Sequence, residues 1–183
     1  MVSNSSHPAA LYTLRKVTRV LALLILLLVV VGFFLPTTYQ VERQIVINTP
    51  RNVVLEKMFQ GDFLSRWLFV QNGQVDLFDG LLKAGDSVGL SYDDASKRGE
   101  LMLVNVSSDR VRFDVRPKEG VNLVQNTIRL QSVGQTTHVQ WTIAGDLSAG
   151  LLSPYLAVFA NSIAGHNFEK SLQQLKTLLE TNH

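Results

Sequence analysis

The sequence contains no cysteine, and this absence excludes several kinds of chemistry. Disulfide bonds, thiolate nucleophiles and cysteine-bound zinc all need that residue. Catalytic signatures are missing as well, because no G-x-S-x-G elbow, P-loop or G-x-G-x-x-G loop occurs in the chain. The sequence therefore favours a binding protein over an enzyme, and it predicts no cofactor.

Histidine is also scarce, with 4 residues among the 183. His166 and Glu169 are close enough on a predicted helix to share a metal ion, but no motif supplies the further ligands that a protein metal site normally has. We therefore predict no metal site. His138 is predicted to face solvent, because strand alternation places it opposite Val139 and Trp141.

Charged side chains are almost absent from the first 41 residues. Arg15, Lys16 and Arg19 are the exceptions, and they are three of the 17 basic residues in the chain. The remainder therefore carries 14 basic against 15 acidic residues and is close to neutral. Nucleic-acid binders normally show a basic patch or stripe, so nucleic acid is not a predicted partner.

One long apolar run follows these three basic residues. Residues 20–35 are all apolar or glycine, and with residues 17–19 they approach the ~20 residues needed to cross a bilayer. No basic residue follows until Arg43, so the positive-inside rule places the N-terminus in the cytoplasm. The sequence predicts a cytoplasmic tail over residues 1–16, disordered over its first 12 residues, a transmembrane helix over 17–35, and an extracytoplasmic domain over 39–183.

A cleaved signal peptide would also begin with basic residues and an apolar run. Cleavage requires small side chains at alternate positions, whereas the run from Gly32 to Pro36 contains two phenylalanines and a leucine. We therefore predict an uncleaved anchor that ends at Pro36.

The domain is predicted to begin with a strand over residues 39–47, followed by two short helices. Thr49 and Pro50 provide a helix start for residues 51–59. Asp62 caps a second helix over 63–69, on which Phe63 and Trp67 share a face. Alternation and turn residues then predict six strands in an antiparallel meander, over residues 75–78, 88–92, 100–106, 110–116, 121–131 and 136–144.

Other charged residues of this region are predicted to be solvated. Asp93 and Asp94 stand in a turn composition rather than in a catalytic pair. Three arginines, Arg110, Arg112 and Arg116, alternate with apolar residues and so form the polar side of a strand.

The last predicted element is a long helix over residues 153–180. Its second half carries a core-facing apolar stripe formed by Phe168, Leu172, Leu175 and Leu179. In the first half the same stripe holds only small residues and an amide, namely Ala157, Asn161, Ala164 and Gly165, so we expect space beneath it that a ligand could occupy. A second apolar face, which could meet protein or lipid, is formed by Leu152, Leu156, Phe159 and Ile163.

This order of elements resembles the helix-grip fold of the START-like superfamily, also called SRPBCC. The opening from Tyr39 to Pro50, together with Val53, Asp62 and Trp67, is similar to the bacterial polyketide cyclase/dehydrase-like branch. The close of the chain is similar as well, in His138 to Trp141, in Gly145 and in the final helix from Gly165 to Lys176. The resemblance covers residues 39–180 and consists of spaced apolar, glycine and proline positions.

The resemblance implies an α+β fold, in which a curved antiparallel sheet of about seven strands surrounds the C-terminal helix. It also implies an apolar cavity between sheet and helix, which binds hydrophobic ligands in many relatives; some relatives are cyclases, and others are lipid carriers or regulators. Residues expected near the cavity are Trp67, Tyr92, Phe113, Trp141, Ala157, Asn161 and Ala164.

Our first hypothesis is a single-pass protein of the bacterial inner membrane, whose periplasmic domain binds a hydrophobic small molecule or a lipid. One alternative is a cyclase- or dehydrase-type enzyme acting on a membrane-derived substrate. Another is a non-catalytic module that binds another membrane protein. Convergent ionisable side chains inside the cavity would favour the enzyme.

Overall fold

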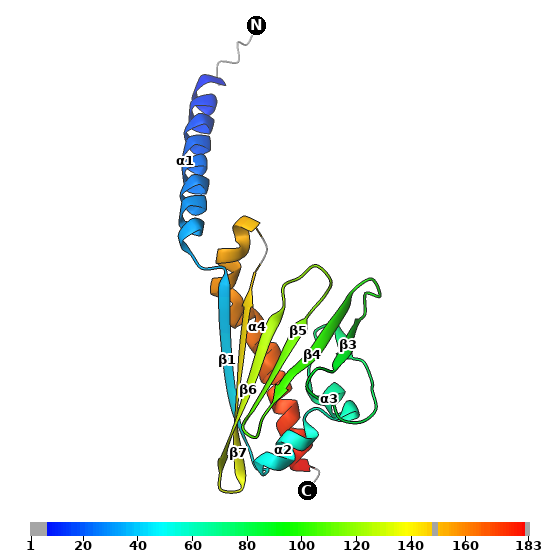
Figure 1. The fold of residues 1–183 in the computed structure, drawn as a ribbon. Helices are drawn as coiled ribbons and strands as arrows, with labels where there is room; N and C mark the ends of the chain where they lie inside the picture. The colour runs from blue at the N-terminus through cyan, green and yellow to red at the C-terminus, as the bar shows by residue number, and fades with distance from the viewer. Residues whose placement is uncertain (1–6, 148–149, 182–183) are drawn as a thin grey trace.

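A computed structural model describes the backbone of residues 7–147 and 150–181, and the side chains of 12–147, 150–159 and 165–181 within it. The described part of the chain begins with helix α1 (His7–Phe34), which extends away from a domain made of one sheet and several helices (Figure 1). Leu35, Pro36 and Thr37 alone connect α1 to the first strand. The prediction of disorder is wrong for residues 7–12, which continue α1 because proline is tolerated in a first helical turn.

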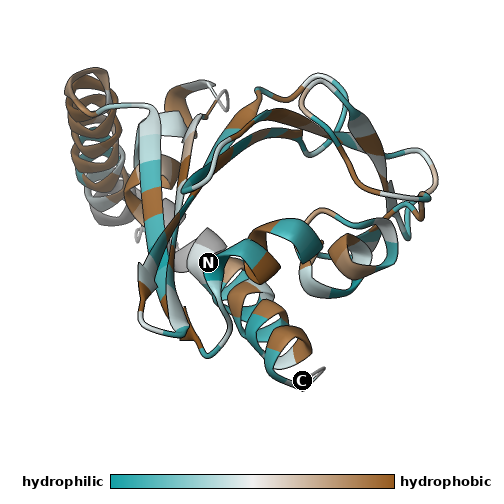
Figure 2. Cartoon of the chain, turned by 60° about the horizontal axis from the view of Figure 1, so that its bottom comes forward, coloured by the Kyte–Doolittle hydropathy of each residue, from teal (hydrophilic) through white to brown (hydrophobic). Residues whose placement is uncertain are grey.

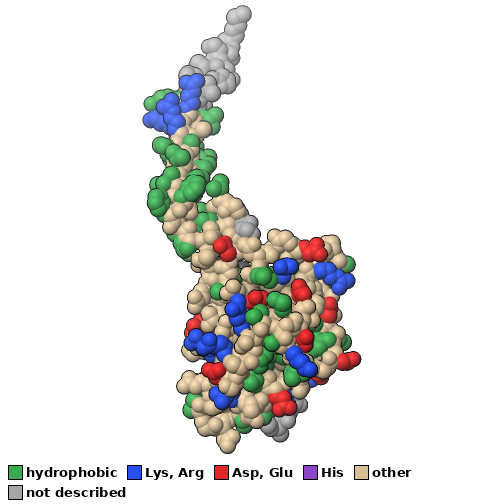
Figure 3. All heavy atoms as spheres, viewed as in Figure 1, with side chains coloured by type: hydrophobic (Ala, Val, Ile, Leu, Met, Phe, Trp, Pro, Cys, Tyr) green, Lys and Arg blue, Asp and Glu red, His purple; other side chains and the backbone are tan. Residues whose placement is uncertain are grey.

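Helix α1 is the one helix of the described chain that is long and apolar enough to cross a membrane, over Tyr12–Phe34. Apolar side chains cover it, and basic side chains gather near its end farthest from the domain (Figure 3). None of the side chains in its most apolar stretch is buried against the rest of the protein.

The described residues of the domain form seven strands, two short helices, one 3₁₀ turn and one long helix. In chain order these are β1 (Thr38–Ile47), α2 (Arg51–Lys57), α3 (Gly61–Trp67), β2 (Gly73–Val75), β3 (Ser87–Tyr92), β4 (Arg98–Val106), β5 (Arg110–Arg116), β6 (Val124–Val133), β7 (Thr136–Asp146), the 3₁₀ turn η1 (Gly150–Leu152) and α4 (Ser153–Thr181). The strand order is β1-β7-β6-β5-β4-β3-β2, and every neighbouring pair is antiparallel. The predicted α+β class and seven-stranded antiparallel sheet are confirmed.

Several predicted boundaries differ from the structure. Pro50 occupies the N-cap of α2 and Gln60 that of α3, whereas Thr49 and Asp62 were the expected caps. Gly61 begins α3 rather than following α2, because its amide donates to the carbonyl of Gly80 and its missing side chain admits the Phe78 carbonyl. Strand β2 is shorter and earlier than predicted, and β6 begins later.

The sheet curves around α4, so that one face of every strand points toward this helix (Figure 2). The predicted alternation is confirmed on this inner face, where Phe113, Trp141 and Ile143 are buried. The α4 stripe is confirmed as well, since Leu172, Leu175 and Leu179 are buried and Phe168 packs against the same core.

Polar contacts hold α4 between the two ends of the sheet. On the β1 side, Nε of Arg43 donates to Oε1 of Glu169 over 2.7 Å, and the amide of Asn48 donates to Oε1 of Glu180 over 2.7 Å. On the α3 side, the amide of Phe69 donates to Oγ of Ser171 over 3.0 Å. Helix α4 therefore closes the curved sheet from β1 across to the segment after α3.

Candidate functional site

An aromatic cluster fills the middle of the space between the sheet and α4. Trp141 of β7 lies at its centre, with ring centroids 5.8 Å from Trp67, 6.0 Å from Phe113 and 5.0 Å from Phe168. Phe59 completes the cluster at 5.6 Å from Phe113. Such tilted and edge-to-face pairs stabilise a core beyond simple area burial. Three predicted pocket residues, Trp67, Phe113 and Trp141, are thus fully buried core residues here, and their contact with a ligand stays a prediction.

The polar atoms of this cluster are satisfied within the protein. Nε1 of Trp67 donates to the carbonyl of Met58 over 2.7 Å, and Nε1 of Trp141 donates to Oδ1 of Asn126 over 3.0 Å. Asn126 in turn donates from Nδ2 to the carbonyl of Val124 over 2.9 Å. Sequence analysis missed Asn126, although its alternation with the inward-facing Ile128 would have placed it inside the sheet.

Beyond Asn126, toward α1, the inner face becomes half-buried. The register aligns Tyr39 with Gly145 and Val124 with Val115, while Tyr92 ends β3 at the same end of the sheet. Apart from Gly145, the residues just named have side chains that are partly exposed and pack against the core. We call these four residues, Tyr39, Tyr92, Val115 and Val124, the rim.

The rim is apolar apart from two phenol groups. The ring of Tyr39 lies over Gly145, where a Cβ atom would come within 2.6 Å of the phenol oxygen, so a larger residue would require the ring to shift. Burial raises the pKa of Tyr39 and of Tyr92 above the usual value, because the apolar surroundings disfavour phenolate. Both phenols are therefore neutral at physiological pH and can donate a hydrogen bond.

The expected space under the small stripe of α4 is occupied at one position. The guanidinium group of Arg43 fills the place that a side chain at Gly165 would take, while its Nε pairs with Glu169 one helical turn further on. The expectation of a void at Gly165 is therefore wrong. Ala157 is buried, as expected for a residue on the sheet-facing side of α4. The side chains of Asn161 and Ala164 lie outside those the structure describes.

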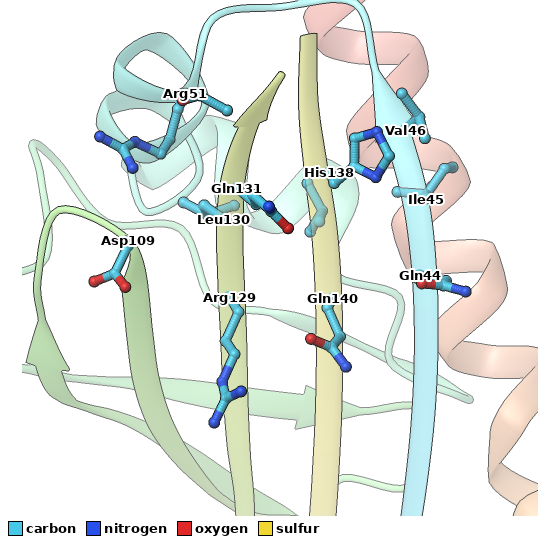
Figure 4. Close-up of a pocket in the computed structure, with 12 residues that line it drawn as sticks. Gln44, Ile45, Val46, Arg51, Asp109, Arg129, Leu130, Gln131, His138 and Gln140 are labelled. Carbon is cyan, nitrogen blue, oxygen red and sulfur yellow. The ribbon is translucent and has the colours of Figure 1, made fainter.

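A depression of about 830 Å³ lies on the outer face of the sheet (Figure 4). His138 of β7 is exposed there beside Val46 and Gln131, which are its register partners on β1 and β6. The prediction that His138 faces solvent is confirmed. The charged groups at this depression are Arg51, Asp109 and Arg129, which come from three different segments. They form an open polar surface rather than an enclosed reaction site.

The remaining sequence candidates also have structural roles. Glu169 pairs with Arg43, and the described residues contain no group of three or more metal-ligating side chains around His166 or elsewhere. Asp94 stands in the β3–β4 turn, where its Oδ1 accepts from the amide and the hydroxyl of Ser96 and its Oδ2 lies 3.0 Å from Nζ of Lys97. The hydrogen bond from the Ser96 hydroxyl is the largest cause that lowers the pKa of Asp94 to about 2. The predicted solvated turn is confirmed.

Comparison with known proteins identifies the fold but no family. No protein-family model matches the chain, and no curated protein matches it. Protein CV1439 from Chromobacterium violaceum is similar in structure with a TM-score of 0.60, at 13% identity over 77% of this chain and 96% of its own. Protein NE0264 from Nitrosomonas europaea gives a TM-score of 0.60, at 14% identity over 79% of this chain and 96% of its own.

A third similar structure belongs to DynU16, a protein of the dynemicin biosynthetic locus. Its TM-score is 0.56 at 16% identity, over 78% of this chain and 48% of DynU16. Identities this low establish a shared fold and leave function to the site itself. The architecture, a curved antiparallel sheet closed by a C-terminal helix, is that of a helix-grip domain.

Proposed function

We propose that this chain is a single-pass membrane protein whose START-like domain binds an apolar small molecule or a lipid inside the grip. One observation carries the proposal: the half-buried rim and helix α1 lie at the same end of the sheet. The register places Thr38, which follows α1, opposite Asp146, in the row next to Tyr39 and Gly145. The half-buried end of the apolar interior thus faces the side from which α1 emerges.

The chemistry of the interior supports binding. The inner face carries mostly apolar and aromatic side chains. Its buried amide, Asn126, already bonds to Trp141, and its arginine, Arg43, already pairs with Glu169. Asp114 is the one charged residue among the buried residues described, and the register sets it beside Met102 and Gln125, on the face away from Phe113. An apolar site with a few hydrogen-bonding groups, here the rim phenols, is typical of pockets for hydrophobic ligands.

Membrane anchoring by α1 has two supports. The apolar stretch Tyr12–Phe34 contains 23 residues, enough for a ~30 Å hydrocarbon core. Helix α1 also packs against the domain, since the hydroxyl of Tyr155 donates to the carbonyl of Leu28 and its ring lies against Gly32. A helix with a partner in the mature domain fits an uncleaved anchor, in the bacterial inner membrane with the domain in the periplasm.

The test is to extract the full chain with its lipids in a non-denaturing detergent and to identify co-purifying molecules by mass spectrometry. Val124→Trp would fill the rim, whereas Val133→Trp adds the same bulk at an exposed site on the same strand. We expect the native chain and the Val133 variant to retain an apolar molecule that the Val124 variant loses. Retention by all three, or by none, would contradict binding inside the grip.

The same extract separates the two alternatives. A cyclase- or dehydrase-type enzyme would convert a bound polyketide-like or lipid molecule, so substrate and product would both be found. An interaction module would bring down a second membrane protein with no small molecule in the grip.

A further inference from the structure

A surface segment at the start of α4 is apolar and exposed. It comprises η1 and the first turns of α4, Gly150–Phe159, and we call it the apolar segment. Leu151 is 66% exposed and Phe159 60% exposed, and Leu152 and Val158 are similarly open. No Asp, Glu, Lys or Arg occurs between Asp146 and Glu169. A contiguous exposed patch of this kind normally marks a contact with protein or membrane.

The apolar segment lies beside the last turns of α1. Tyr155 contacts Leu28 and Gly32, as described above. A small gap of about 230 Å³ between the two is lined by Val29, Gly32 and Phe33 from α1 and by Gly150, Leu151 and Pro154 from the apolar segment. The exposed face of the segment is therefore continuous with the apolar surface of α1, where Phe34 is 85% exposed.

The depth of this contact follows from helix geometry. Leu28 precedes Phe34, the last residue of the apolar stretch, by six residues. At ~1.5 Å per residue, Leu28 lies roughly 9 Å along the helix axis from that end. If Tyr12–Phe34 spans the bilayer, Tyr155, which contacts Leu28, must lie at membrane depth as well. Interfacial helices bury their apolar faces to a comparable depth, ~5–10 Å, and tyrosine is enriched at this level.

We infer that Gly150–Phe159 inserts into the outer leaflet beside α1 and docks the rim of the grip against the lipid surface, a conclusion that rests on the proposed span of α1. The partner is a lipid surface because the face continues that of α1, because it carries no charge, and because its anchor point on α1 lies within the bilayer. Insertion supplies a route by which an apolar ligand reaches the grip directly from the leaflet.

The absence of native cysteine permits a depth measurement on the full chain. The single-cysteine variants Leu152→Cys and Phe159→Cys are each labelled with an environment-sensitive fluorophore. The labelled chains are then placed in vesicles of phosphatidylcholine and phosphatidylglycerol. The vesicles contain lipids with a nitroxide near the headgroup or near the end of the acyl chain. Leu26→Cys in α1 is the control for membrane depth, and Gln135→Cys, in the β6–β7 hairpin at the opposite end of the sheet, is the control for water.

We expect the headgroup-proximal nitroxide to lower fluorescence at residues 152 and 159 on the order of two-fold, as for a segment ~5–10 Å deep in the interface. The label at residue 135 should be unaffected and open to aqueous iodide. Adding Phe159→Asp should reduce quenching of the label at residue 152, because a carboxylate opposes insertion, whereas Gln135→Asp should not.

Each other outcome overturns the inference. Labels at residues 152 and 159 that are open to iodide and unquenched by lipid, with Leu26→Cys quenched, would show an anchored domain that stays clear of the bilayer. Labels that neither aqueous iodide nor the lipid nitroxides quench would show that a protein, such as a second copy, covers the segment. Loss of quenching at residue 26 would instead refute the span of α1 and the proposed anchoring with it.

Discussion

At the residue scale, Asn126 is the polar group on which the aromatic core depends. Its Oδ1 accepts from Nε1 of Trp141 in the buried interior, and its Nδ2 donates to the carbonyl of Val124 at the rim. Asn126→Ala should lower the free energy of unfolding by ~1–3 kcal/mol, because the indole N–H would stay buried without a partner. Asn52→Ala, on the exposed side of α2, should change it by no more than about 0.5 kcal/mol. Chemical denaturation of the detergent-solubilised chain measures both, and equal effects would contradict a structural role for Asn126.

Asp94 gives a second residue-scale prediction, in the β3–β4 turn. Its folded pKa is about 2, with the Ser96 hydroxyl as the first cause, so the folded state favours the carboxylate. The resulting stabilisation is complete above the unfolded pKa, ~3.9, and is lost as the pH falls toward 2. Ser96→Ala should raise the pKa of Asp94, and Ser107→Ala, in another turn, should not. Carboxyl-carbon NMR titration reads the pKa directly; an unchanged value in Ser96→Ala would refute the assigned cause.

Single residues also show where sequence reasoning succeeds and fails. Alternation placed His138 outside and Trp141 inside correctly, because a strand has only two faces. Helical periodicity placed the small residue Gly165 on the core-facing stripe of α4. It could not reveal that the Arg43 side chain occupies the space beneath Gly165. Arg43 and its partner Glu169 are 126 residues apart, and such a contact depends on how β1 and α4 pack.

At the scale of elements, the second half of α4 is a core helix held by its leucines. Leu175 is fully buried, and Leu175→Ala should cost ~2–5 kcal/mol of stability because it removes a packed side chain and leaves a cavity. Gln173→Ala, on the exposed face of the same helix, is the matched control. Thermal unfolding of the two variants in detergent should separate them clearly. A similar cost for both would mean that α4 is not packed against the sheet in solution.

The elements with strong patterns were predictable and the short ones were not. Strand β5 has the predicted bounds, and α4 differs from its prediction by one residue, because alternation and a helical stripe are unambiguous over such lengths. Strand β2 has three residues, too few for a periodic signal. Gly61, the first residue of α3, lies so close to the Phe78 carbonyl that a side chain there would clash, and no local pattern reveals such a contact.

At the scale of the whole molecule, the order of elements was predictable from the sequence. That the rim and α1 lie at the same end of the sheet follows only from the strand register. The proposed orientation gives a further prediction. A reporter enzyme active only in the periplasm, fused after His183, should be active, because the proposed orientation has Arg15, Lys16 and Arg19 at the cytoplasmic end of α1. A reporter active only in the cytoplasm should be silent at the same site. The reverse pattern would overturn the orientation, and release of a shorter soluble protein would overturn the anchor.

The three-residue connection between α1 and β1 limits where the domain can travel. Leu35, Pro36 and Thr37 together reach about 10 Å when fully extended. With α1 in the bilayer, the domain diffuses in two dimensions and cannot cross an aqueous compartment. Its encounters then depend on areal density and lateral diffusion rather than on concentration in volume. Under the proposed function, any exchange of cargo takes place with the adjacent leaflet, or with a protein that comes to the surface of the same membrane.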